Sequence, residues 1–150
     1  MTVAFSQLML RLRGFLELVL EVQDLDRSLA FYRDVLGLTL VERWPPERPG
    51  AWVRLGDNEV LGLWEPKSGG PGVGLHGGRG GSHVHFAVYV GEGSLAAWSE
   101  RLSQAGYEVE GPVSFRHGSS IFVTDPDGHV LELGDWARDW EGRPVQKERA

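Results

Sequence analysis

Apolar and polar residues alternate along two stretches of the chain, which begin at Glu17 and at His83. Every second residue in each stretch is apolar, a pattern typical of a strand with one buried face. A helix is expected after each strand. The first helix begins after Asp24, a favourable N-cap residue, and ends at Gly37, and the second spans about 94–106.

Three further short strands are predicted after each helix. Their ranges are 38–43, 51–55 and 59–64 in the first half and 108–113, 119–124 and 129–133 in the second. The order βαβββ therefore occurs twice, and the predicted fold class is α+β, with two paired βαβββ modules whose curved sheets enclose a metal or ligand cleft. We expect residues 1–150 to form one domain, with module one at about 15–66, a linker at 68–82 and module two at about 83–136.

The two halves also share short sequences. A Ser-Leu-Ala tripeptide at 28–30 recurs at 94–96, and the alignment that superposes these tripeptides also superposes Glu17 on His83. The closing strands match in a slightly wider register, which aligns 60–63 with 130–133. This self-similarity predicts an internal repeat of one supersecondary unit.

More than half of the residues in the linker at 68–82 are glycine, so this segment is expected to be flexible. The motif GxGxxG occurs at 72–77, but it leads into a strand, whereas a dinucleotide-binding fingerprint follows a strand and opens a helix. We therefore expect no dinucleotide cofactor. His76 in the linker and His129 in a turn are expected to be solvated.

Composition narrows the choice of partners. The formal net charge of -6 and the scattered cations argue against a nucleic-acid partner, and no apolar run is long enough to predict a membrane span. The apolar residues 1–10 are interpreted as a packing arm and not as a signal peptide, because arginines follow that run instead of preceding it. A cytoplasmic protein is expected.

Since the chain has no cysteine, any metal must be bound by His, Asp or Glu.

Ligand-type side chains fall on equivalent strand faces. Glu17 and His83 open the first strand of each module, and Glu132 lies on the final strand, on the face away from the helices. One imidazole and two carboxylates suit a divalent Mn, Ni, Zn or Fe ion. The alternative is structural: a solvated Glu17, a hydrogen-bonded His83 and a Glu132 in an ion pair. A concave face favours the metal, since two carboxylates buried there need a cation or a proton.

His85 lies on the same strand face as His83, about 7 Å further along. We predict His85 as the catalytic acid or base for a metal-bound substrate, with the alternative that it only hydrogen-bonds a metal ligand. Trp64, on the same face as Gly62, and Phe122 are expected to provide aromatic walls for an organic ligand.

Two segments resemble the signatures of a known family. Residues 20–37 resemble the opening, and residues 125–133 the closing strand, of the vicinal-oxygen-chelate superfamily of glyoxalases, bleomycin- and fosfomycin-resistance proteins and extradiol dioxygenases. The resemblance implies a metal cleft between paired βαβββ modules, with ligands at Glu17, His83 and Glu132. Glu17 departs from the commoner His or Gln, and Gly62 stands at the fourth ligand position of glyoxalase I.

Within that family the chain looks most like the fosfomycin-resistance thiol transferases, through the Glu-Arg-Trp sequence at 42–44 and the segment at 134–136. The residues that would contact fosfomycin match poorly. Val19 stands where those enzymes have Thr, Phe122 where they have Tyr, and residues 116–118 differ from their loop. Thiol addition to fosfomycin is therefore expected to be feeble.

The function expected from the resemblance is that of a metal-dependent lyase, isomerase or thiol transferase acting on a small oxygen-bearing substrate. A metal-free protein that sequesters a cationic drug, as bleomycin-resistance proteins do, is the first alternative, and an extradiol-type dioxygenase, against which Glu17 argues, is the second. We expect a homodimer, and the sequence leaves open whether modules pair within or between chains.

In the C-terminal segment Trp136 and Trp140 have helical spacing, which predicts a helix that covers a sheet edge or a partner chain.

Overall fold

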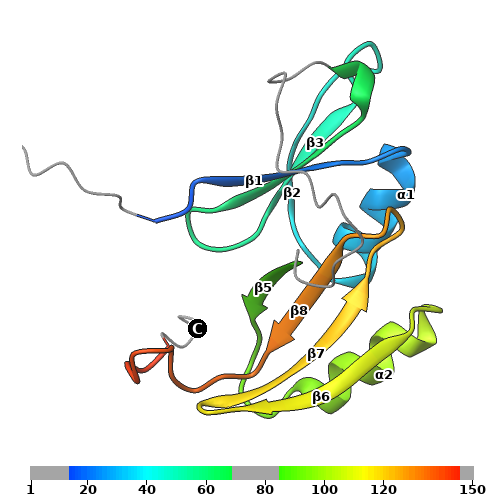
Figure 1. Cartoon of the computed structure of the whole chain (residues 1–150). Helices are drawn as coiled ribbons and strands as arrows, with labels where there is room; N and C mark the ends of the chain where they lie inside the picture. The colour runs from blue at the N-terminus through cyan, green and yellow to red at the C-terminus, as the bar shows by residue number, and fades with distance from the viewer. Residues whose placement is uncertain (1–13, 69–84, 146–150) are drawn as a thin grey trace, which may run out of the picture.

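The computed structural model describes residues 14–68 and 85–145 (Figure 1). Its elements are β1 (Glu17–Glu21), α1 (Leu25–Leu29), the π-helical turn η1 (Ala30–Val35), β2 (Leu40–Arg43), β3 (Gly50–Arg54), β4 (Val60–Trp64), the 3-10 helix η2 (Pro66–Ser68), β5 (His85–Tyr89), α2 (Leu95–Gln104), β6 (Val109–Phe115), β7 (Gly118–Thr124) and β8 (Val130–Gly134). The predicted α+β fold with βαβββ repeated is confirmed. No helix in these residues is long and apolar enough to span a bilayer.

The strands form two four-stranded mixed sheets, in the orders β1-β4-β3-β2 and β5-β8-β7-β6. In each sheet the first strand runs parallel to the last strand of its own module, and the other neighbours are antiparallel. Figure 1 shows the first sheet in the upper part of the molecule with α1 beside it, and the second sheet in the lower part. The helix α2 packs against β6 and β7 on the core face of the second sheet. The strand β1 is an edge strand of the first sheet, and β5 is an edge strand of the second.

Strand pairing corrects the register of the internal repeat. Glu17 pairs with Val60 in the first sheet, and His85 pairs with Val130 in the second. Since Val60 and Val130 open the equivalent strands β4 and β8, the counterpart of Glu17 is His85 and not His83. The alignment of Glu17 with His83, which followed from the shared tripeptides, is therefore wrong.

Unequal connections explain the error. The first helix has its N-cap at Asp24, which accepts a hydrogen bond from the backbone N of Arg27 at 3.0 Å, whereas the second has its N-cap at Ser94. The segment from His85 to Ser94 is longer than the segment from Glu17 to Asp24, so the turn before α2 is longer than the turn before α1. The Ser-Leu-Ala tripeptides at 28–30 and 94–96 are consequently not equivalent.

The first helix is also longer than the second, counted from its N-cap to its terminal glycine. The extra length is accommodated by η1, where the backbone N of Leu36 donates to the carbonyl of Phe31 at 2.9 Å, an i to i+5 hydrogen bond. Both helices still end at the predicted glycines, Gly37 and Gly106, which have φ of 78° and 89°. Positive φ strains residues that carry a Cβ, so glycine is favoured at both helix ends.

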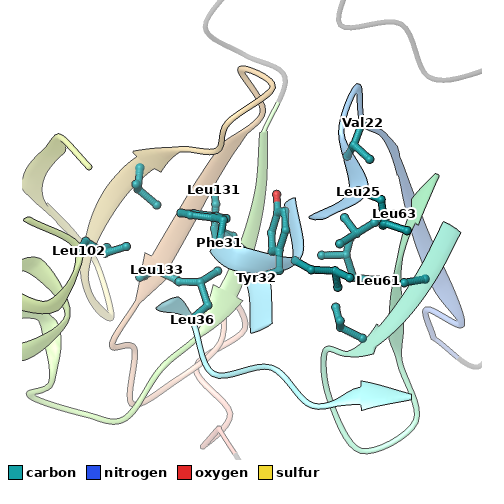
Figure 2. Packing of buried hydrophobic residues seen from close by; sticks show 14 of the residues in the cluster. Val22, Leu25, Phe31, Tyr32, Leu36, Leu61, Leu63, Leu102, Leu131 and Leu133 are labelled. Atoms are coloured by element: carbon teal, nitrogen blue, oxygen red, sulfur yellow. The ribbon is translucent and has the colours of Figure 1, made fainter. Parts of the chain in front are cut away.

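One hydrophobic core spans both modules, and α1 with η1 lies at its centre (Figure 2). Leu61 and Leu63 of β4 lie on one side of this helix and Leu131 and Leu133 of β8 on the other, with Tyr32 between them. All five side chains are buried. The helix therefore covers the apolar faces of both sheets at once.

Polar contacts from module two fix both ends of this helix. At its N-terminal end Asp127 accepts hydrogen bonds from the backbone N of Gln23 at 3.0 Å and from the hydroxyl of Ser28 at 3.2 Å. At its C-terminal end Arg101 of α2 donates to the backbone carbonyl of Val35. His129, expected to be solvated, is half-buried, and its Nε2 lies 3.0 Å from the backbone carbonyl oxygen of Glu21.

The C-terminal tail differs from its predicted structure. Residues 135–145 form turns and no helix, with an isolated bridge between Arg138 and Pro144. The Asp139 carboxylate accepts hydrogen bonds from the backbone N of Glu141 and of Arg143, and these backbone hydrogen bonds lower the pKa of Asp139. A side chain that satisfies backbone donors in this way favours a turn over a helix.

The buried contact between Tyr32 and Asp125 generates a test of the shared core. The Tyr32 hydroxyl donates to Asp125 Oδ2 at 2.7 Å, and burial raises the pKa of Tyr32. Tyr32→Phe leaves this carboxylate oxygen without its donor and should lower the free energy of unfolding by about 1–3 kcal/mol, measured by urea denaturation. The control Tyr107→Phe, whose hydroxyl makes no hydrogen bond within the described residues, should change it by less than about 0.5 kcal/mol. Equal losses in the two variants would contradict this role for Tyr32.

Candidate metal and ligand site

Each sheet has an open face on the side away from the shared core. Along β1 the side chains of Leu18 and Leu20 pack against the core, whereas Glu17 and Val19 lie on the opposite face. On β8 Leu131 and Leu133 are in the core, so Val130, Glu132 and Gly134 share the open face. On β5 the open-face residues are His85, Ala87 and Tyr89. The predicted alternation of the two faces is confirmed.

His85 and Glu132 meet on the open face of the second sheet. His85 Nε2 lies 3.1 Å from Glu132 Oε2, and Glu132 is only 8% exposed. Phe122 is the neighbour of Glu132 on β7, and its ring centroid lies 6.0 Å from that of His85. This distance is that of a hydrogen bond between the two side chains, in which an N–H on His85 Nε2 donates to the Glu132 carboxylate.

In the first sheet the acid on the open face, Glu17, has a hydrogen-bond partner of a different kind. Glu17 Oε1 accepts a hydrogen bond from the indole Nε1 of Trp52 at 2.8 Å. Trp52 pairs with Gly62 on β4, the residue equivalent to Glu132 in the repeat. A Cβ at Gly62 would lie 2.7 Å from Trp64 Nε1 and 3.0 Å from Trp52 Nε1. Glycine therefore lets the indoles occupy the space that a ligand side chain would take.

Three tryptophans gather on this open face. The ring centroids of Trp44 and Trp64 are 4.6 Å apart and those of Trp52 and Trp64 are 5.8 Å apart, both in edge-to-face geometry. Arg48 lies over Trp44, with its Cζ 4.4 Å from the ring centroid. The sequence predicts Trp64 in an aromatic wall, and the described structure adds Trp44 and Trp52 to it.

Glu17, His85 and Glu132 do not come together within one chain, since no three His, Asp or Glu side chains of residues 14–68 and 85–145 form a group that could hold a metal ion. The predicted ligand His83 and the linker residue His76 lie outside the described residues. Ligation by Glu17, His83 and Glu132, and catalysis by His85, thus remain predictions. What the structure adds is the contact between His85 and Glu132.

A cavity of about 440 Å³ lies over this contact, and His85 and Glu132 both line it. Five aromatic side chains complete most of its lining: Tyr89, Phe115, Phe122, Trp136 and Trp140. Of these five, Phe122 is the ring predicted from the sequence to line a ligand site. Tyr89 follows His85 and Ala87 at a period of two, so its place on the open face could have been inferred. A second cavity, of about 280 Å³, lies between the modules and no acidic or cationic side chain lines it.

The close approach at Gly62 generates a test of the first sheet. Gly62→Ala should push the Trp52 and Trp64 indoles apart, weaken the bond to Glu17 and lower the free energy of unfolding by about 1–3 kcal/mol, since overpacking of a filled site is destabilising. Near-ultraviolet circular dichroism should change with it. In the control Gly91→Ala the nearest atom to the new Cβ is 3.7 Å away, so little change is expected. An unaltered spectrum and stability for Gly62→Ala would contradict the packing described here.

Comparison with known proteins matches this architecture. The model of the "Glyoxalase/Bleomycin resistance protein/Dioxygenase superfamily" matches residues 14–133. Among solved structures the lactoylglutathione lyase of Agrobacterium tumefaciens superposes with a TM-score of 0.63 at 25% identity, over 81% of this chain and 92% of that one.

Curated relatives include thiol-transferring enzymes. The glutathione transferase FosA of Serratia marcescens is 35% identical over 123 residues, which cover 81% of this chain and 80% of the relative. The metallothiol transferase FosB of Staphylococcus haemolyticus is 25% identical over 128 residues, which cover 81% of this chain and 83% of the relative. With this match along most of its length, the chain belongs to the glyoxalase, bleomycin-resistance and dioxygenase superfamily that its sequence resembles.

Proposed function

We propose that this protein is a metal-dependent enzyme of the glyoxalase superfamily, a transferase or lyase that binds a small oxygen-bearing substrate on a divalent ion. His85 and Glu132 are the ligands from one chain, and Glu17 is the ligand from a second copy. His85 takes the ligand position predicted for His83, because it is His85 that is equivalent to Glu17 in the strand register.

The contact between His85 and Glu132 is the observation that carries this proposal. A carboxylate that is 8% exposed is costly unless it is paired, and its hydrogen-bond partner among the described residues is His85. Imidazole and carboxylate bind metals in their deprotonated forms, so an ion between these side chains would replace the hydrogen bond that joins them. This donor set suits Mn, Fe, Ni or Zn. Bound there, the ion would polarise substrate oxygen atoms as a Lewis acid.

The arrangement of the open faces supports a homodimer. Both faces lie away from the core that α1 fills, and they expose apolar side chains, with Val19 50% and Tyr89 55% exposed. The edge strands β1 and β5 each have a neighbour on one side only within the described sheets. Unpaired edges and apolar faces are commonly covered by association. Pairing the first module of one copy with the second module of the other brings Glu17 to His85 and Glu132.

The side chains then have separate tasks. Trp52 engages Oε1 of Glu17 and orients the carboxylate, which leaves Oε2 for the ion or the substrate. Phe122 and the other aromatic residues of the cavity exclude water from the ligand pair and strengthen its electrostatic interactions. In this proposal His85 is a metal ligand. The catalytic acid or base, a role predicted for His85 from the sequence, is then another group.

Metal binding is the direct test. Protein purified without chelators should hold close to one divalent ion per chain, and His85→Ala and Glu132→Ala should each lose it, measured by elemental analysis. Adding metal at about 100 times its dissociation constant should stabilise the native protein by about 2.7 kcal/mol. The control His117→Ala, at a histidine that does not line the cavity, should retain the ion.

Retention of metal by His85→Ala with loss of turnover would return His85 to the role of acid or base. Failure of the wild-type protein to bind Mn, Fe, Ni or Zn at all would contradict the enzyme proposal and favour the metal-free sequestering protein.

Sharing of the site between chains is tested by complementation. Glu17→Ala and Glu132→Ala should each abolish tight metal binding in their own homodimers. In a heterodimer of the two variants, one site has all three ligands and the other has lost two. Coexpression of both variants should therefore restore about a quarter of the wild-type metal content, as random pairing of a twofold dimer requires. No recovery in a mixture that contains heterodimers would show that the site lies within one chain.

A further inference from the structure

The cavity over His85 and Glu132 has an aromatic lining with a defined structure. Trp136 is held in place, since its Nε1 donates to the buried hydroxyl of Ser120 at 3.0 Å. Its indole lies 4.6 Å from that of Trp140, in edge-to-face geometry, and 5.3 Å from the ring of Phe115. A Cβ at Gly118 would come within 2.7 Å of the Trp136 Cα, so the tail lies directly on the sheet here. The cavity therefore presents rings at fixed positions.

Trp140 differs from the other rings because it is 66% exposed. The tail residues beside it form a turn whose backbone N–H groups at 141 and 143 both donate to Asp139, at 2.9 Å. This turn positions the indole over the cavity without burying it. An exposed aromatic side chain on a locally stabilised turn is available to stack on a ligand at a small cost in conformational entropy.

The charge of the cavity restricts the ligand further. Glu132 is the acid in its lining, and no lysine or arginine is among the residues that line it. Arg143, in the tail that carries Trp140, is paired with Asp139 at 2.8 Å and with Glu141 at 3.0 Å. The faces of aromatic rings are electron-rich, so they favour cations and repel anions. An anion would lose its hydration in this cavity without gaining a lysine or arginine partner from these residues.

We propose that the ligand of this cavity is a neutral or cationic aromatic small molecule, stacked on Trp140 and Phe122. This assignment names the substrate class of the enzyme proposed above and rests on that proposal for its catalytic meaning. The lining itself differs from a binding site for a small phosphonate or carboxylate, because it has no lysine or arginine, and only the proposed ion would attract an anion there. Ring stacking supplies the affinity, and in the metal-free protein Glu132 favours a positive charge.

Three probes that share one ring system test the assignment: 1-naphthylmethanol, 1-naphthylmethylamine and 1-naphthylacetate. Titration calorimetry is performed on the full chain with EDTA, so that no carboxylate can bind through a metal. The alcohol and the amine should bind at least about tenfold more tightly than the acetate, and cyclohexylmethanol about tenfold more weakly than the naphthyl alcohol. Equal affinity for the acetate and the alcohol, or for the cyclohexyl and naphthyl alcohols, would overturn the assignment.

Substitutions of aromatic residues show in which cavity the naphthyl probe binds. Trp140→Ala should weaken binding of the naphthyl alcohol about fivefold or more, whereas Trp140→Phe should retain most of it, because a stacking ring remains. Trp98→Ala, checked for folding by circular dichroism, removes an indole that lines the other cavity and should leave binding unchanged. Glu132→Gln should remove any preference for the amine over the alcohol. Unchanged binding by Trp140→Ala would place the probe elsewhere and overturn the assignment.

The two proposals can fail separately. Metal uptake by a protein that shows no preference among the probes would leave the enzyme proposal intact and exclude the aromatic ligand. Aromatic selectivity in EDTA, from a protein that never binds metal, would support the ligand class and exclude the metal-dependent chemistry. If no probe binds, the cavity is closed by the chain itself or by a second copy, and the aromatic ligand is excluded.

Discussion

Packing of α1 and η1 between two sheets is the interaction on which the rest of the structure depends. Tyr32 and Phe31 are fully buried in a core that includes residues of both β4 and β8. The apolar faces of both sheets contribute to the core around this helix, so the modules share one core, as stacked repeat units do. The contacts of Asp127 and Arg101 at the two helix ends then fix how the modules are oriented. Both open faces consequently lie away from the core.

Much of this arrangement could be predicted from the sequence because its determinants are local. The period of two along β1 and β8 identifies the open faces and places Glu17 and Glu132 on them. Asp24 and Gly37 mark the ends of the first helix by capping chemistry that involves a few neighbouring residues. Such signals do not depend on how distant segments meet.

Features that depend on distant segments or on connection length could not be predicted in the same way. The placement of His85 beside Glu132 follows from the register of β5 on β8, which the longer turn before α2 obscured in the repeat. The bond from Trp52 to Glu17 joins strands that are not neighbours in the sheet. In the tail, the helical spacing of Trp136 and Trp140 was misleading, because Asp139 satisfies backbone donors and forms a turn.

The difference between Gly62 and Glu132 breaks the symmetry of the repeat at one pair of equivalent positions. Where the first module has packed indoles, the second has a carboxylate beside an imidazole. When the two open faces are paired as proposed, a ligand between them meets the packed indoles and Glu17 on one side, and the His85 and Glu132 pair with its aromatic cavity on the other. Because the two sides differ, the two orientations of an asymmetric ligand are not equally favourable. A scaffold of two similar halves can in this way direct attack to one face of a prochiral centre.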